Sequence, residues 1–303
     1  MKTFLIPPSK VLHLAKSILT KTNDFKIVFP GFNRDGKRYF PDGEVYMRIL
    51  KANKLRDKRV IVLHSGAPKP NEGLMELELI LQILRDNNVR PEVFFTYFPY
   101  GMQDKVSEKG ETNVAKNLIA KLTNYYKVKK IYVIDPHFGE RKWVKKYPIV
   151  SISAVPFLIK KAKEDFGLPS RILRNKTWEG ENILFLSPDI GGKRRTGVLG
   201  IKKKRLTSFK VKMVSPELNF KGKVVGVIDD MIKTGETLLK FQEIAKKSGA
   251  EKIIALITHG VIPSGVSKIK KKYSKLYSTN TIWQKEANID ITDLILANIK
   301  KYD

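Results

Sequence analysis

The hydrophobic positions of the chain fall into short apolar runs, which alternate with longer stretches where apolar residues recur every three or four positions. The short runs predict buried β-strands, and the longer stretches predict amphipathic helices. A strand and a helix are expected in the first twenty residues. Further strands are expected at 59–64, 92–100 and 130–138, and helices at 73–88 and 113–126.

The second half of the chain repeats this alternation. It predicts helices at 155–167 and 236–249 and strands at 183–186, 223–230, 252–260 and 275–282. Repeated strand–helix–strand patterns are typical of parallel sheets with helices on both faces. Because 303 residues suffice for two ordinary domains, we expect an α/β protein with one domain at 1–150 and another at 151–303.

Composition narrows the class of protein. Apolar residues make up 42% of the chain, enough for a buried core, and the absence of cysteine excludes disulfides and cysteine-based zinc sites. No apolar run has the length of a membrane span, and the N-terminus lacks a cleavage-site pattern for secretion. We therefore expect a cytoplasmic enzyme without membrane association.

The charge is strongly positive, because 58 Lys and Arg residues face 30 Asp and Glu residues, which gives +28. Such a surface attracts polyanions. The lysines are nevertheless spread along the wet faces of the expected helices, and no basic segment carries the interleaved aromatic residues of a single-strand binding platform. We interpret them as solvated lysines and do not expect specific nucleic-acid binding.

Acids and imidazoles follow several of the expected strands. Asp135 and His137 follow the strand at 130–134, and Asp189 and His259 lie at the ends of two later strands. Ligands of such sheets bind at the carboxyl ends of the strands. Carboxylates and imidazoles without cysteine suit a hard cation such as Mg²⁺, held together with phosphate oxygens.

Two adjacent acids, Asp229 and Asp230, end another strand and are followed by Thr234, Gly235 and Thr237, just before the helix at 236–249. Backbone N–H groups at a helix N-terminus form a phosphate cradle, and the threonine hydroxyls add donors. The two carboxylates beside such a cradle can hold the hydroxyls of a sugar. The residues alone leave the identity of the sugar open.

Several segments resemble known sequences. VIDDMIKTGET (227–237) resembles the phosphoribosyl-diphosphate loop of type I phosphoribosyltransferase folds. Other segments resemble, in the same order, motifs of ribose-phosphate diphosphokinase, also called phosphoribosyl pyrophosphate synthetase. These segments span nearly the whole chain, and they are FPDGEVYMRI (40–49), YFPYGMQDK (97–105), DPHFGE (135–140), SPDIGGKRR (187–195), ITHGVIPSG (257–265) and STNTI (278–282).

This resemblance implies two phosphoribosyltransferase type I-like domains and an Mg²⁺-dependent enzyme. Such an enzyme transfers the diphosphoryl group of ATP to the anomeric hydroxyl of ribose 5-phosphate, and it works as a homo-oligomer whose ATP site is shared between subunits. Roles carried over by position are ribose 5-phosphate binding for Asp229, Asp230, Thr234, Gly235 and Thr237, ATP binding for Phe40, Asp42, Glu44, Gln103 and Asp104, metal binding for His137 and Asp189, and catalysis for Lys203 and Arg205.

The chain also departs from the family pattern. Met102 stands where the motif has an arginine that contacts ATP, Lys233 replaces an acid in the phosphate loop, and the stretch 193–202 is short. Two alternatives therefore stay open at this stage. One is a weakly active or inactive regulatory paralogue of the diphosphokinase, and the other is a phosphoribosyltransferase, which consumes the diphosphate sugar.

Overall fold

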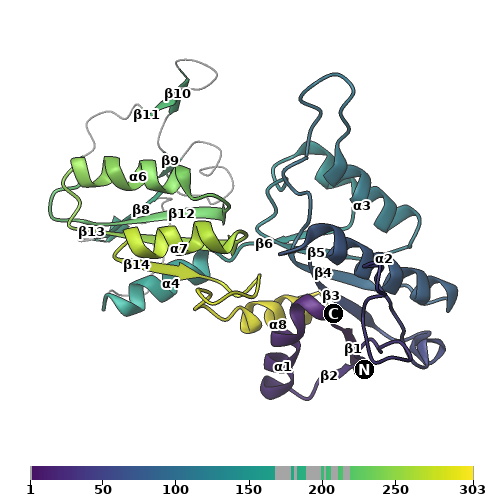
Figure 1. The fold of residues 1–303 in the computed structure, drawn as a ribbon. Helices are drawn as coiled ribbons and strands as arrows, with labels where there is room; N and C mark the ends of the chain where they lie inside the picture. The colour runs from purple at the N-terminus through teal and green to yellow at the C-terminus, as the bar shows by residue number, and fades with distance from the viewer. Residues whose placement is uncertain are drawn as a thin grey trace. The chain divides into compact units, whose positions relative to one another are not determined.

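The computed structural model describes residues 2–167, 179–180, 183–188, 199–200, 203–205, 211–213 and 219–302. The chain divides into two compact units, one formed by Met1–Ile152 with Thr292–Asp303 and the other by Ser153–Ile291. Figure 1 shows both as sheets flanked by helices. Of the helices that the structure describes, none combines the length and apolarity needed to cross a bilayer.

The first unit is built on a fully parallel sheet with strand order β2-β1-β3-β4-β5-β6. Because β3 pairs with the opposite edge of β1 from β2, the direction of winding reverses there, and such reversals leave a crevice at the carboxyl ends of the strands. The strands are β1 Thr3–Ile6, β2 Phe25–Ile27, β3 Val60–Ser65, β4 Glu92–Tyr97, β5 Ile131–Ile134 and β6 Ile149–Ile152.

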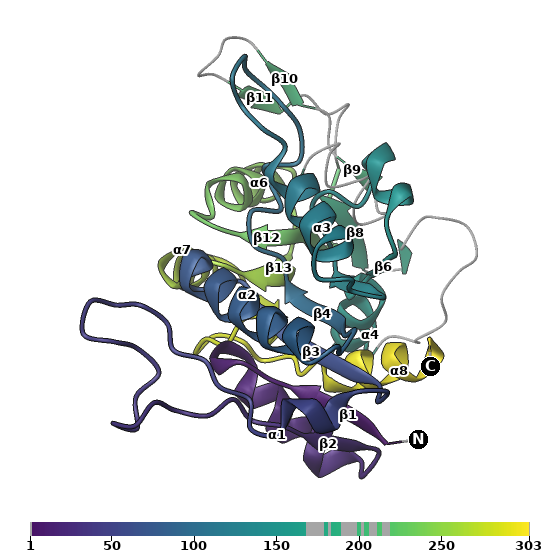
Figure 2. The same cartoon turned by 90° about the vertical axis from the view of Figure 1, so that its right-hand side faces the viewer.

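Helices cover both faces of this sheet. The apolar stripes of α2 and α3 pack on the face that presents residues such as Val62 and Val133. Helix α1 lies beside α8 (Figures 1 and 2). The helices are α1 Leu12–Lys21, α2 Pro70–Asp86, α3 Val114–Asn124 and α8 Thr292–Lys301, with short 3-10 turns η1 Ser9–Val11, η2 Ala52–Leu55 and η3 Lys142–Lys146.

The last helix, α8, folds with the first unit, which differs from the range 151–303 that we expected for the second domain. Thr292 donates a hydrogen bond from its hydroxyl to Ser17 on α1 over 2.9 Å, and Lys21 pairs with Asp293 at 2.7 Å. The carbonyl of Tyr302 accepts a hydrogen bond from Lys130, just before β5. A return of the chain to its first sheet leaves no periodic signal in the sequence, which explains the difference.

The second unit contains a sheet ordered β14-β13-β12-β8-β7, with β9 also paired to β8. Its pairs are parallel except for that between β7 and β8. The antiparallel pair β10–β11 is separate. The elements are α4 Val155–Asp165, β7 Glu179–Gly180, β8 Ile183–Ser187, β9 Leu199–Gly200, β10 Lys203–Arg205, β11 Val211–Met213, β12 Val224–Ile232, α6 Glu236–Lys247, β13 Lys252–Gly260, α7 Pro263–Lys272 and β14 Lys275–Ser278.

Alternating side chains of this second sheet enter two cores. Val225 and Val227 point toward α6 and α7, whereas Ile228 on the same strand points toward α4. Gly226, between Val225 and Val227, has no room for a side chain, because a Cβ there would lie 2.5 Å from the ring of Phe185 on β8. The expected α/β class and the parallel sheets flanked by helices are thus confirmed.

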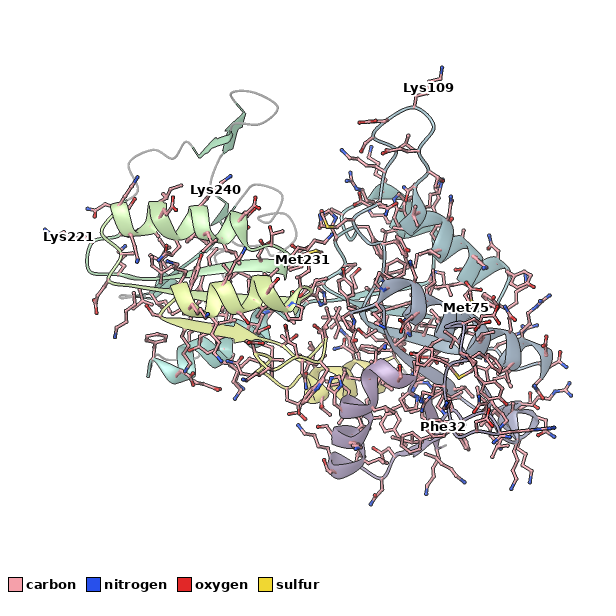
Figure 3. The ribbon with its side chains drawn as sticks, viewed as in Figure 1. Phe32, Met75, Lys109, Lys221, Met231 and Lys240 are labelled. Atoms are coloured by element: carbon pink, nitrogen blue, oxygen red, sulfur yellow. The ribbon has the colours of Figure 1, made fainter. Side chains whose placement is uncertain are left out.

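Many lysines lie on the wet faces of these elements. Lys109 lies in the loop between β4 and α3, Lys221 lies just before β12 and Lys240 lies on α6, and all three side chains project outward (Figure 3). This placement matches the interpretation of the lysines as solvated.

A buried imidazole in the first core makes the stability of that unit depend on pH. His64, near the end of β3, is fully buried, and neither ring nitrogen has a hydrogen-bond partner within the described residues. Burial lowers the pKa of His64 to about 3, from an ordinary value of 6.5. Since the unfolded chain takes up this proton first, folding stability falls as the pH drops below about 6.5.

We expect the free energy of unfolding to decrease by roughly 1.4 kcal/mol between pH 7.5 and 5.5 through this group alone. Denaturant titrations at the two pH values test it, and His64→Gln should remove that part of the difference. Ser65→Ala, at the neighbouring buried position, removes no titratable group, so it is the control and should leave the difference unchanged. An equal pH effect in wild type and His64→Gln would contradict the expectation.

Candidate active site

The adjacent acids Asp229 and Asp230 lie in the second half of β12, which continues to Ile232. Pairing with β8 stops at Val227, while pairing with β13 continues to Ile232. Asp229 is half-buried and Asp230 is 3% exposed, and the amide of Asp230 donates a hydrogen bond to the carboxylate of Asp229 over 3.0 Å. Both acids therefore lie toward the carboxyl end of the sheet, where ligands of such folds bind, and Asp229 is the more open of the two.

The segment after β12 forms the loop that the sequence predicts. Gly235 has φ +80° and stands at the N-cap position of α6, so the chain turns in a left-handed conformation that glycine adopts without strain. Thr234 is exposed and Thr237, in the first turn of α6, is half-buried. The unpaired N–H groups of the first helical turn, with the positive end of the helix dipole, provide a site for an anionic oxygen group.

Helix α7 holds this loop in place. A Cβ on Gly265, in the first turn of α7, would lie 1.8 Å from the carbonyl oxygen of Lys233 and 3.2 Å from the carbonyl carbon of Thr234. A Cβ on Gly235 would lie 3.1 Å from Ile269 on the same helix. The backbones of loop and helix thus approach more closely than any side chain permits, and this contact fixes the shape of the loop.

A buried polar network lies at the end of the neighbouring strand β13. Nδ1 of His259 lies 2.9 Å from the hydroxyl of Thr281, and the hydroxyls of Thr279 and Thr281 both donate hydrogen bonds to the carbonyl of Thr258. His259 is 2% exposed. We expected this imidazole among the groups available to a ligand, and its burial gives it a structural part instead.

In the first unit, Asp104 holds the end of the segment YFPYGMQDK in place, and Asp104 is 2% exposed. Its carboxylate accepts two hydrogen bonds from Arg141, one from Nε over 2.8 Å and one from Nη2 over 3.0 Å. Its backbone carbonyl accepts hydrogen bonds from the side chains of Asn113 and Trp143. The preceding residue, Gln103, is exposed. Of the two residues that we expected near ATP, Gln103 is open to solvent and Asp104 is held inside.

The loop after β5 places His137 beside this carboxylate. Asp135 adopts φ +36°, which is unusual for a residue other than glycine, and the amide of Gly139 closes a turn by donating to the carbonyl of Pro136. Nδ1 of His137 lies 3.5 Å from Oδ2 of Asp104. The pKa of Arg141 is raised, chiefly because its guanidinium donates hydrogen bonds to Asp104. The ion pair between Asp104 and Arg141 thereby joins the loop after β4 to the loop after β5.

The segment FPDGE forms a tight turn on an arm between β2 and β3, which projects from the first unit in Figure 2. Its backbone closes through a hydrogen bond from the amide of Phe40 to the carbonyl of Glu44, and the carboxylate of Asp42 accepts one from the amide of Glu44. Phe40 is 41% exposed, and Asp42 and Glu44 are exposed. All three side chains are therefore available to a ligand or partner.

The other expected site residues are placed as follows. Lys203 and Arg205 lie at the two ends of β10, which pairs with β11, and the structure describes their backbone. Asp189 lies outside the described residues. Within the described residues, no three His, Asp or Glu side chains come together as a metal-binding group.

Sequence reasoning missed Arg141 and the contact made by Gly265. The spacing of Arg141, four residues after His137, was the available signal for the first.

Two units with mostly parallel sheets, the second with adjacent acids and a glycine turn at a helix N-terminus, define the phosphoribosyltransferase type of fold. The chain superposes over its full length on phosphoribosylpyrophosphate synthetase from Mycobacterium smegmatis, with a TM-score of 0.80, 21% identity and 99% of that chain covered. Residues 34–126 match the family model described as the N-terminal domain of ribose phosphate pyrophosphokinase, and residues 201–301 match the phosphoribosyl synthetase-associated domain.

Curated relatives agree. Ribose-phosphate pyrophosphokinase of Pyrococcus furiosus is 33% identical over 268 residues, which cover 85% of this chain and 89% of the relative. The enzyme of the same name from Pyrococcus abyssi is 29% identical over 98% of both chains. The chain belongs to the ribose-phosphate pyrophosphokinase family, as its motifs led us to expect.

The close contact at Gly265 gives a prediction. Gly265→Ala forces the Lys233 carbonyl to move by more than 1 Å, so we expect binding of ribose 5-phosphate, the ligand expected from the sequence, to weaken at least about tenfold. Alanine otherwise stabilises a helix relative to glycine, so helix propensity does not explain a loss. Calorimetric titration measures the affinity. Ser264→Ala, at the exposed neighbouring position, is the control, and equal affinity in both variants would contradict the expectation.

Proposed function

We propose that the protein transfers the diphosphoryl group of ATP to the anomeric hydroxyl of ribose 5-phosphate, which yields 5-phosphoribosyl 1-diphosphate and AMP. Family membership supports a diphosphokinase, and the observation that carries the residue assignment is the loop after β12. There, two adjacent acids near the end of β12 are followed, five residues after Asp230, by the glycine turn at the N-terminus of α6. Neither alternative from the sequence is favoured, because the matched relatives carry the pyrophosphokinase name over most of the chain.

In this proposal the second unit binds the sugar phosphate. Backbone amides of 234–237 and the hydroxyls of Thr234 and Thr237 donate to the 5-phosphate, and Gly235 lets the backbone approach it. Asp229 and Asp230 accept hydrogen bonds from the ribose hydroxyls. Lys233, which is exposed beside the loop, adds a positive charge near the phosphate.

The nucleotide is assigned to the first unit. The projecting arm supports this, because Phe40 offers an exposed aromatic face to adenine, and Asp42 and Glu44 offer carboxylates to its amino group. Gln103 is exposed on the loop after β4, and the buried Asp104 supports that loop from the interior. Since the arm extends away from its own unit, we propose that it completes the ATP site of a second copy and that the enzyme is a homo-oligomer (Figure 2).

Mg²⁺ is the cofactor in this proposal, with His137 and Asp189 as its protein ligands. The half-buried carboxylate of Asp229 and the imidazole of His137, whose Nδ1 faces a carboxylate, are donors of suitable chemistry. When bound, the cation neutralises phosphate charge. Mg²⁺ ordinarily takes few protein ligands and keeps contacts to substrate phosphates and water, which fits this small set.

The chemistry needs positioning and positive charge. The anomeric oxygen bonds to the β-phosphorus and releases its proton to water, the bond from that phosphorus to the α–β bridging oxygen breaks, and AMP leaves with the electron pair of that bond. Lys203 and Arg205, two residues apart on β10, are assigned to neutralise the charge that develops on the phosphoryl oxygens.

The proposed substrates, ATP and ribose 5-phosphate, and the lack of cysteine support a cytoplasmic location.

Coupled detection of AMP tests the function. With ATP, ribose 5-phosphate and Mg²⁺, we expect AMP and the diphosphate sugar in equal amounts, and no AMP when the sugar phosphate is omitted or the metal is chelated. Lys203→Ala is the control for contaminating enzymes, and it should lower turnover far more than sugar-phosphate binding. If well-folded protein releases no AMP with any of several nucleotides and divalent metals, the result would favour the regulatory paralogue.

Met102 provides a gain-of-function prediction. It is 47% exposed next to Gln103, where the family motif has an arginine. Met102→Arg adds a charge-assisted contact worth about 1.5–3 kcal/mol, so we expect KM for ATP to fall about tenfold or more. Met75→Arg is the matched control, because Met75 is 48% exposed on α2 (Figure 3) and gives the same added charge without that position. Equal KM shifts in both variants would show a general charge effect.

A further inference from the structure

We propose that Asp104, held by Arg141, is a positioning residue that fixes the tautomer and orientation of the His137 imidazole, and that it does not itself contact the nucleotide. This inference rests on the metal role that the proposed function gives to His137.

The first argument is that the Asp104 carboxylate is held in one orientation by Arg141. Both of its oxygens accept hydrogen bonds from the guanidinium of Arg141, and only 2% of its side chain is exposed. Such a two-point pair fixes the plane of the carboxylate as well as its position. A group buried in this way is poorly placed to reach a nucleotide in solvent, whereas it is well placed to direct a neighbouring side chain.

The second argument is that the neighbouring side chain is His137. Its Nδ1 is buried, has no hydrogen-bond partner within the described residues, and lies 3.5 Å from Oδ2 of Asp104. At this distance the contact is mainly electrostatic. A neutral imidazole carries one N–H, and the carboxylate favours that hydrogen on Nδ1. Nε2 then keeps its lone pair, which is the form of histidine that ligates a cation.

The third argument is that the two loops are locked together at several points. The Asp104 carbonyl accepts hydrogen bonds from Asn113, the N-cap residue of α3, and from Trp143 on η3. The ring of Trp143 stacks on Phe138, the residue after His137, with centroids 5.2 Å apart. The backbone amide of Arg141 also donates to the Phe138 carbonyl. The carboxylate is thus rigid relative to the loop that it directs.

Histidine ¹⁵N NMR of the intact, Mg²⁺-free protein at pH 8 tests the inference, with the His137 signals assigned by their loss in His137→Gln. We expect wild-type His137 to carry its hydrogen on Nδ1 and Asp104→Asn to give a mixture of tautomers. Mn²⁺, used as the probe in electron paramagnetic resonance titrations, should bind Asp104→Asn about tenfold more weakly, as is typical when the partner of a ligating histidine is changed.

Arg141→Lys is the second variant, because it keeps the charge and removes the two-point geometry. It should show a smaller tautomer change in the same direction, and it decides the test if Asp104→Asn does not fold. Glu92→Gln is the matched control. Glu92, at the start of β4, also accepts two hydrogen bonds from one arginine, Arg59, and is largely buried, so this variant should lose stability and leave His137 unchanged.

A wild-type His137 that carries its hydrogen on Nε2 would overturn the inference, and so would an unchanged tautomer in both Asp104→Asn and Arg141→Lys. Failure of the proposed metal role is seen separately, because His137→Gln would then bind Mn²⁺ as wild type does. In that case the tautomer measurement alone decides whether Asp104 directs the imidazole.

Discussion

The contact between helix α7 and the backbone of the loop after β12 is the constraint on which the second unit's site depends. Gly265 lets the helix lie directly against the Lys233 carbonyl, and Gly235 supplies the left-handed turn that aims the chain into α6. Neither residue offers a side chain to a ligand. Their effect is to fix the backbone of the loop at the carboxyl end of the sheet, so that the sugar-phosphate binding that we propose there needs little further ordering of the backbone.

In the first unit, an ion pair holds the loops at the carboxyl ends of the strands in place. The loops after β4 and β5 are joined by the pair of buried Asp104 and half-exposed Arg141, and the neighbouring residue Gln103 is exposed. Such an ion pair contributes little net stability, because the desolvation of Asp104 offsets the attraction. Its geometry, however, is specific, which suits a position that directs His137. The two units therefore hold their functional loops by different means, close backbone packing in one and a two-point ion pair in the other.

The sequence predicts the parts of this arrangement that depend on local pattern. The apolar run before Asp229 and the glycine before α6 made the strand, the loop and the helix predictable, and the order of the motifs made the family predictable. Helix α7 was missed because its segment PSGVSKIKKK has few apolar positions and a glycine in its first turn. The pairing of Asp104 with Arg141 joins residues 37 positions apart, and α8 returns from the end of the chain, so both depend on tertiary contacts that periodicity does not encode.

The most direct test of the account is a crystal structure of the protein with ribose 5-phosphate bound. The account predicts phosphate oxygens within hydrogen-bond distance of the amides at 234–237, with the ribose hydroxyls on Asp229 and Asp230. A structure in which this loop is empty and the sugar phosphate occupies another part of the chain would contradict it.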